Sequence, residues 1–189
     1  MNVFDIFAFV WGILDAMFRF VENGFSAMFP YLPPSSMPFV IAIFCYSVLA
    51  GLVWAINQTD KSVKRVGLKI VYYTFTVLII LMFIWRMGLI AMIPSGDIVS
   101  NVSEFFITLF YVVFGIFLVY SFLKKVTWLK RGILIFTWTV FLFDVFLIAP
   151  AFGEMALNEN TITSVLILSI IFAIPNGLNR WQKVKESGV

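Results

Sequence analysis

Long apolar runs separated by short polar segments make up most of the chain. Five of these runs are close to the length that an α-helix needs to cross the hydrocarbon layer of a membrane, about 20 residues. Polar residues, proline or glycine flank each run, as expected where a membrane-spanning helix ends. The predicted spans are residues 38–56, 70–93, 105–123, 133–152 and 161–178. The last span is expected to kink or end near Pro175.

The N-terminal segment, residues 3–22, has a different pattern in which polar and small residues recur at spacings of three and four. On an α-helix this spacing places them in one narrow stripe on an otherwise apolar surface. The stripe consists of Asp5, Ala8, Gly12, Asp15, Arg19 and Glu22. Arg19 follows Asp15 by four residues and precedes Glu22 by three, so these charges are expected to pair along the helix.

Two placements of this N-terminal helix stay open on sequence grounds. It lies in the outer membrane interface, because charges at mid-bilayer are costly, or it forms a sixth span whose stripe faces other helices or a neighbouring subunit. The predicted fold class is therefore all-α, a polytopic helical membrane protein with five spans, or six under the second placement. Residues 1–29 form the amphipathic N-terminal helix and residues 30–189 a single transmembrane bundle.

Composition supports a membrane location. Hydrophobic residues make up 62% of the chain and charged residues 12%, and the mean hydropathy is +1.02, whereas a soluble domain is roughly half apolar and a quarter charged. The net charge of +3 would suit nucleic acid, but the basic residues are concentrated in short segments beside the apolar runs. We therefore expect the lipid bilayer as a partner and no nucleic acid.

The basic residues also predict an orientation. They follow the first, third and fifth spans, in segments 61–69, 124–131 and 180–185, while the intervening loops contain acidic residues and no basic one. Short cytoplasmic loops are enriched in lysine and arginine. The C-terminus is thus predicted to be cytoplasmic, in the inner membrane of a bacterium or, alternatively, on the matrix side of an organellar membrane.

Several kinds of chemistry are disfavoured by the residue types present. The chain has no histidine, which is the commonest general base and metal ligand, and Cys45 is its one cysteine. We found no phosphate-binding glycine loop, nucleophile elbow or zinc-protease motif. The expectation is a protein that is not an enzyme, with no cofactor and no metal site.

Two ionisable residues fall inside predicted spans, Arg86 and Asp144. At 1.5 Å rise per residue, both lie roughly 10–12 Å from the outer ends of their spans. An isolated charge at that depth is costly, so an intramembrane ion pair between them is predicted. Such a pair fixes helix register or lines a polar path, and Arg86 has the further alternative of reaching the outer headgroups.

Span one contains a ridge of small residues at spacing four, Ser47, Gly51 and Ala55, which suits close helix packing within the chain or, less often, between subunits. Two functions follow from the whole pattern. The first is a non-enzymatic subunit of a larger membrane assembly, such as a secretion, conjugation, respiratory or envelope complex. The second is a small oligomeric channel or transporter in which Arg86 and Asp144 line the path. The predicted protein partners are accordingly other membrane subunits or further copies of this chain.

Overall fold

The computed structural model describes residues 2–60, 62–91, 98–151, 153 and 158–186. Every regular element in these residues is helical. The elements are α1 (Val3–Met28), the 3-10 turn η1 (Pro34–Ser36), α2 (Met37–Gln58), α3 (Ser62–Ala91), α4 (Ile98–Leu123), α5 (Thr127–Phe143), the π-helical turn η2 (Asp144–Ile148), α6 (Ala149–Ala151) and α7 (Glu159–Glu186).

Four stretches in the described residues are long and apolar enough to cross a membrane. They are Pro34–Gln58, Ser62–Met82, Thr127–Ala151 and Glu159–Trp181. The remaining predicted span, residues 105–123, corresponds to α4, a helix of 26 residues in which the apolar stretch Val112–Leu123 is described. The predicted all-α class is therefore confirmed, with four helical stretches among the described residues that are long and apolar enough to cross a membrane, and the count of five spans stays a prediction.

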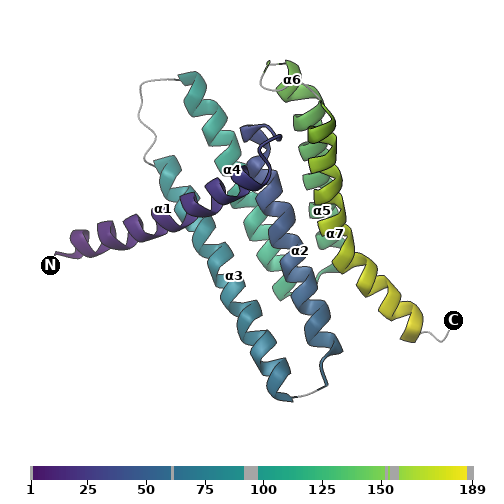
Figure 1. The fold of residues 1–189 in the computed structure, drawn as a ribbon. Coiled ribbons are helices and arrows are strands. Elements are labelled where there is room, and N and C mark those ends of the chain that lie inside the picture. The colour runs from purple at the N-terminus through teal and green to yellow at the C-terminus, as the bar shows by residue number, and fades with distance from the viewer. Residues whose placement is uncertain (1, 61, 92–97, 152, 154–157, 187–189) are drawn as a thin grey trace.

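Helices α2, α3, α4, α5 and α7 form a bundle in which successive helices run in opposite directions (Figure 1). Helix α2 packs against α3, α4, α5 and α7, which makes it the central helix, and its buried residues include Val40 and Leu49. One end of the bundle holds the connection 29–36 between α1 and α2, and we call it the connection end. The segments 62–69, 124–131 and 180–186, rich in lysine and arginine, lie at the opposite end.

Helix α1 does not run with the bundle. It crosses α2 and α3 obliquely, with its N-terminus projecting to one side (Figure 1). Phe18 and Phe25 are buried against the bundle, where Phe18 packs on Trp85 and Phe25 on Phe44 with ring centroids 5.5 and 5.1 Å apart. Large aromatic contacts of this kind hold α1 in place through the hydrophobic area that they bury.

Helix α7 continues through Pro175 to Glu186, beyond the expected end of its span. It changes direction in its C-terminal part (Figure 1), as expected of a helix in which proline removes one backbone donor. The side-chain amide of Asn176 donates a hydrogen bond of 3.0 Å to the Phe172 carbonyl, one residue beyond the carbonyl that Pro175 leaves without its usual donor. The sequence therefore predicted the bend correctly, but not the length of the helix.

Candidate functional site

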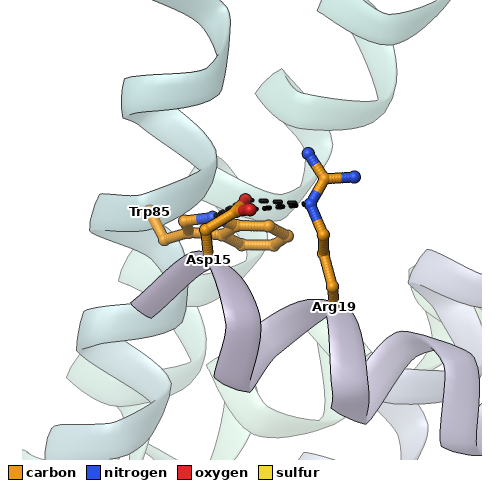
Figure 2. Close-up of polar contacts among 3 residues, drawn as sticks. All are labelled: Asp15, Arg19 and Trp85. Carbon is orange, nitrogen blue, oxygen red and sulfur yellow. Dashed lines mark hydrogen bonds and ion pairs between the residues drawn. The ribbon is translucent and has the colours of Figure 1, made fainter. Parts of the chain in front are cut away.

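Two aspartates join elements that are far apart in sequence. The first, Asp15 of α1, contacts α3 (Figure 2). The indole Nε1 of Trp85 donates a hydrogen bond of 3.0 Å to Asp15 Oδ1, and the Arg19 Nε lies 2.9 Å from Asp15 Oδ2. We call these three residues the Asp15 site. The ion pair expected from the spacing of four is thus present, and the carboxylate has a second partner on another helix.

The Asp15 site lies at the edge of the bundle. The side chains of Asp15 and Arg19 are 30% and 61% exposed, whereas Trp85 is 1% exposed. The hydrogen bond from Arg19 lowers the pKa of Asp15 below its usual value, partial burial works against this, and the Trp85 hydrogen bond lowers the pKa further. Asp15 therefore stays charged at neutral pH.

The second aspartate, Asp144, is buried at the connection end with 6% of its surface exposed. The Ser35 hydroxyl donates a hydrogen bond of 3.0 Å to Asp144 Oδ2. Ser35 belongs to η1 and Asp144 begins η2, so the bond joins two short irregular elements 109 residues apart in the chain. A buried carboxylate requires such donors because removing its hydration is costly.

Contacts with α7 hold the same connection on another side. The Thr161 hydroxyl lies 3.3 Å from the Tyr31 carbonyl oxygen and 3.1 Å from Asn158 Oδ1. Asn158 Oδ1 also accepts a hydrogen bond of 2.9 Å from the Thr161 backbone N–H, the geometry of a helix N-cap. Together with Ser35 and Asp144, these residues form what we call the Asp144 site.

The backbone at Asp144 is itself unusual. Residues Asp144–Ile148 form a π-helical turn, in which the Ala149 N–H donates to the Asp144 carbonyl. A π-turn inserts an extra residue into a helix, and such turns are often found at functional positions. Asp144 and Val145 are both buried at the start of this turn, so the irregular backbone lies where the helix packs against η1.

The structure describes only part of the predicted set of intramembrane charges. Arg86 lies in α3, but its side chain is outside the described residues, so its pairing with Asp144 stays a prediction. Asp5 has a local role, because its Oδ2 accepts a hydrogen bond of 2.8 Å from the Asn2 backbone N–H at the start of α1. Glu22 lies half-buried on α1.

The predicted small-residue ridge on α2 lies partly in the core. Ser47 is buried and donates its hydroxyl hydrogen to the Ile43 carbonyl within the same helix at 2.9 Å, while Gly51 and Ala55 are half-buried. A Cβ placed on Gly51 would meet no atom of the described residues within 4 Å. No described helix therefore uses Gly51 for the close approach that such ridges permit.

Sequence reasoning missed Trp85 and Ser35, the donors that join the two aspartates to other elements. Trp85 lies in an apolar run next to Arg86, so it was treated as one of the apolar residues of a span. Ser35 lies in the polar segment that was interpreted only as the start of the first span. No spacing rule links Asp15 to a residue 70 positions away. A buried aspartate does, however, require donors, and that signal directs attention to the serines at the same end of the bundle.

Metal-ligating side chains do not gather in the described part of the chain, where no group of three or more Cys, Asp or Glu residues could hold an ion. The chemistry available to the Asp15 site and the Asp144 site is the formation of hydrogen bonds between a carboxylate and another helical element. Comparison with known protein families, curated proteins and solved structures gave no match to this chain.

Proposed function

We propose that this protein is a non-enzymatic integral membrane subunit of a larger membrane assembly, such as a secretion, conjugation, respiratory or envelope complex. The observation that carries the proposal is the use of both aspartates in contacts between helical elements, Asp15 with Trp85 and Asp144 with Ser35. Aspartates that form contacts within the protein stabilise one arrangement of its helices. A structural subunit needs such a fixed arrangement to bind its partners.

The proposed topology has five spans formed by α2, α3, α4, α5 with its continuation to Ala151, and α7. The C-terminus is cytoplasmic in a bacterial inner membrane, and the connection end faces outward. Single cysteines in a Cys45-free protein test this arrangement. A cysteine at Ser62 or Thr127 should resist an impermeant thiol reagent in intact cells, and one at Ser100 should react. Labelling of Ser62 from outside would overturn the orientation.

Helix α1 is proposed to lie in the outer interface. The flank with Asp15 contacts α3 at Trp85, close to the connection end, whereas Phe20 and Gly24 on the other flank border α3 residues nearer its middle, such as Leu78. An in-plane helix with this arrangement turns its charges to the headgroups and its apolar flank to the acyl chains. A cysteine at Asn2 should then be labelled from outside, while protection until permeabilisation would support a sixth span.

Photocrosslinking tests the assembly role directly. A photoreactive phenylalanine analogue is placed at Phe9 on α1, Phe117 on α4 or Ile170 on α7, all exposed in the structure. The proposal expects crosslinks from at least one position to a different membrane protein, and fixed-ratio co-purification of that protein in mild detergent. Crosslinks to lipid alone at all three positions, with a single protein species by native mass spectrometry, would contradict it.

One observation favours the second candidate, an oligomeric channel or transporter. Asp144 is buried and begins a π-helical turn. Such turns are frequent at functional positions, and ionisable residues inside membrane spans often mark the path of an ion or substrate. Under this candidate, Arg86 and Asp144 line a polar path. Purified protein in liposomes should then conduct an ion or small solute, and the double variant Arg86→Gln with Asp144→Asn should fold but lose the flux. Crosslinks from the exposed positions only to further copies of the chain would support this candidate over the first.

A further inference from the structure

A large apolar groove lies between α1, α2 and α3. Its volume is about 550 Å³, within the range of roughly 300–1,000 Å³ typical of small-molecule sites. Its lining residues include Phe20, Gly24 and Met28 of α1 and Leu78, Ile79 and Met82 of α3. Phe20 is 78% exposed and Met28 is also exposed, so the groove is open to its surroundings. No charged residue is among those that line it.

The position of the groove along α3 decides which surroundings it meets. It borders α3 from Phe75 to Met82, whereas the Asp15 site contacts the same helix at Trp85. At 1.5 Å per residue, the groove thus extends to about 15 Å below the level of Trp85. Ser62–Met82 is long and apolar enough to cross a membrane. In the proposed topology the groove therefore lies at the depth of acyl chains, beneath a helix that crosses the bundle.

Arg19 supplies a charge on the opposite flank of α1. Its Nε donates to both Asp15 oxygens, at 3.0 and 2.9 Å. Its two terminal nitrogens point away from Asp15 (Figure 2), and they donate no hydrogen bond to a residue that the structure describes. A guanidinium with unused donors is well suited to a phosphate group, because its planar fork matches two phosphate oxygens.

We infer that the groove binds an acyl chain of one phospholipid from the outer leaflet, whose phosphate is bound by Arg19. The lipid lies along the side of α1 that faces away from the bundle. Its headgroup is beside the charged flank of α1, and its acyl chain is beneath the apolar flank. An apolar cavity of this size is filled by hydrocarbon more favourably than by water. The inference goes beyond the assembly role and rests on the proposed in-plane placement of α1, which labelling at Asn2 tests separately.

The test uses the full chain reconstituted in vesicles of phosphatidylcholine and phosphatidylglycerol, with a photoreactive diazirine in the phosphatidylglycerol acyl chain. Crosslinked residues are mapped by mass spectrometry. We expect crosslinks concentrated at Leu78, Ile79 and Met82, several-fold above those at a second apolar groove of about 290 Å³ between α4 and α5, lined by Val113 and Phe136 among others. Equal labelling of the two grooves would overturn a specific site.

Glycine positions on α1 provide matched variants. A Cβ at Gly24 or Gly12 meets no described atom within 4 Å, so both sites accept a side chain, and Gly24 lines the groove while Gly12 does not. Replacing glycine in a helix interior also favours the helix, which protects folding. Gly24→Leu should reduce groove crosslinking several-fold and Gly12→Leu should leave it unchanged. Equal crosslinking in the two variants would contradict the inference.

The phosphate contact is tested with Arg19→Gln and Arg19→Lys. Arg19→Gln should reduce groove crosslinking and the number of phosphatidylglycerol molecules retained in mild detergent, because the cation is gone. Arg19→Lys should retain part of both, since a lysine still attracts phosphate but lacks the planar fork. Unchanged lipid retention in Arg19→Gln would remove the phosphate from the site. Displacement of the lipid label by a crosslinked protein segment would identify a protein occupant instead and overturn the inference.

Discussion

Asp15 and Asp144 perform similar tasks in opposite surroundings. Each accepts a hydrogen bond from a distant element, but the Asp15 side chain is 30% exposed at the edge of the bundle, whereas Asp144 is 6% exposed inside it. Exposed ion pairs contribute roughly 0–1 kcal/mol, while breaking a buried charged contact costs several times more. An aspartate contact therefore contributes little to the stability of α1 packing, whereas the loss of a contact to the aspartate at the connection end destabilises the protein much more.

The sharpest test of this contrast is the predicted pair of Arg86 and Asp144. Arg86→Gln or Asp144→Asn alone should reduce folded yield and thermal stability, because removing one partner of a well-buried pair costs roughly 3–5 kcal/mol. The double variant should recover part of the loss. Size-exclusion yield and melting temperature in detergent measure both effects.

Additive losses in the double variant would show that Asp144 is held without Arg86. Under that outcome Ser35 and the other contacts of Asp144 carry its stabilisation, and Arg86 reaches the outer headgroups. The contrast with Asp15 would remain, since it rests on burial and not on the identity of the partner.

Removing the Ser35 hydroxyl should have the next largest effect. Ser35→Ala takes away a donor to a buried charged group, a loss of about 1.5–3 kcal/mol. The matched control is Ser26→Ala, because Ser26 is exposed on α1. Thermal unfolding of both variants in the same detergent gives the comparison. Equal stability of the two would mean that the Ser35 contact does not hold the connection.

Trp85→Phe should produce a smaller and local effect. The change keeps an aromatic ring against Phe18 but removes the Nε1 donor to Asp15. The loss should lie near the lower end of the roughly 1.5–3 kcal/mol of a hydrogen bond to a charged group, because Asp15 is partly exposed. Hydrogen exchange should increase in α1 and remain the same in α2. Trp128→Phe is the control, since Trp128 is exposed at the start of α5. Faster exchange throughout the bundle would instead give Trp85 a role in the whole fold.

The smallest expected effect is a pH dependence of α1. The Arg19 and Trp85 hydrogen bonds lower the pKa of Asp15, so its stabilising contribution is complete above the usual aspartate pKa of about 3.9 and is lost as the pH falls through the lowered value. Exchange in α1 should therefore be equally protected at pH 7 and pH 5 and should increase only in stronger acid. Asp15→Asn should remove this acid-dependent step. A change between pH 7 and pH 5 would point to another titrating group.

The apolar runs predicted most of the helical bundle correctly because membrane-spanning length and flanking polar residues are local signals. Helices α3 and α7 extend past the predicted spans because polar residues remain helical outside the apolar stretch. The charge pairing of Asp15 with Arg19 was likewise local. The roles of Trp85 and Ser35 were not predicted, since their contacts arise from helix packing across 70 and 109 residues.

The π-turn after α5 has a consequence for how this segment can change in length. Phe141, Val145 and Ala149 are buried at intervals of four, while Leu147 and Ile148 are exposed. The extra residue brings small Ala149 to the inward position that Ile148 would occupy in an uninterrupted α-helix. Loss of a single residue such as Leu147 would restore ordinary helical spacing and leave the inward faces on either side in register. Asp144–Ile148 is thus a place inside a helix where the loss of one residue keeps the inward faces on both sides in register.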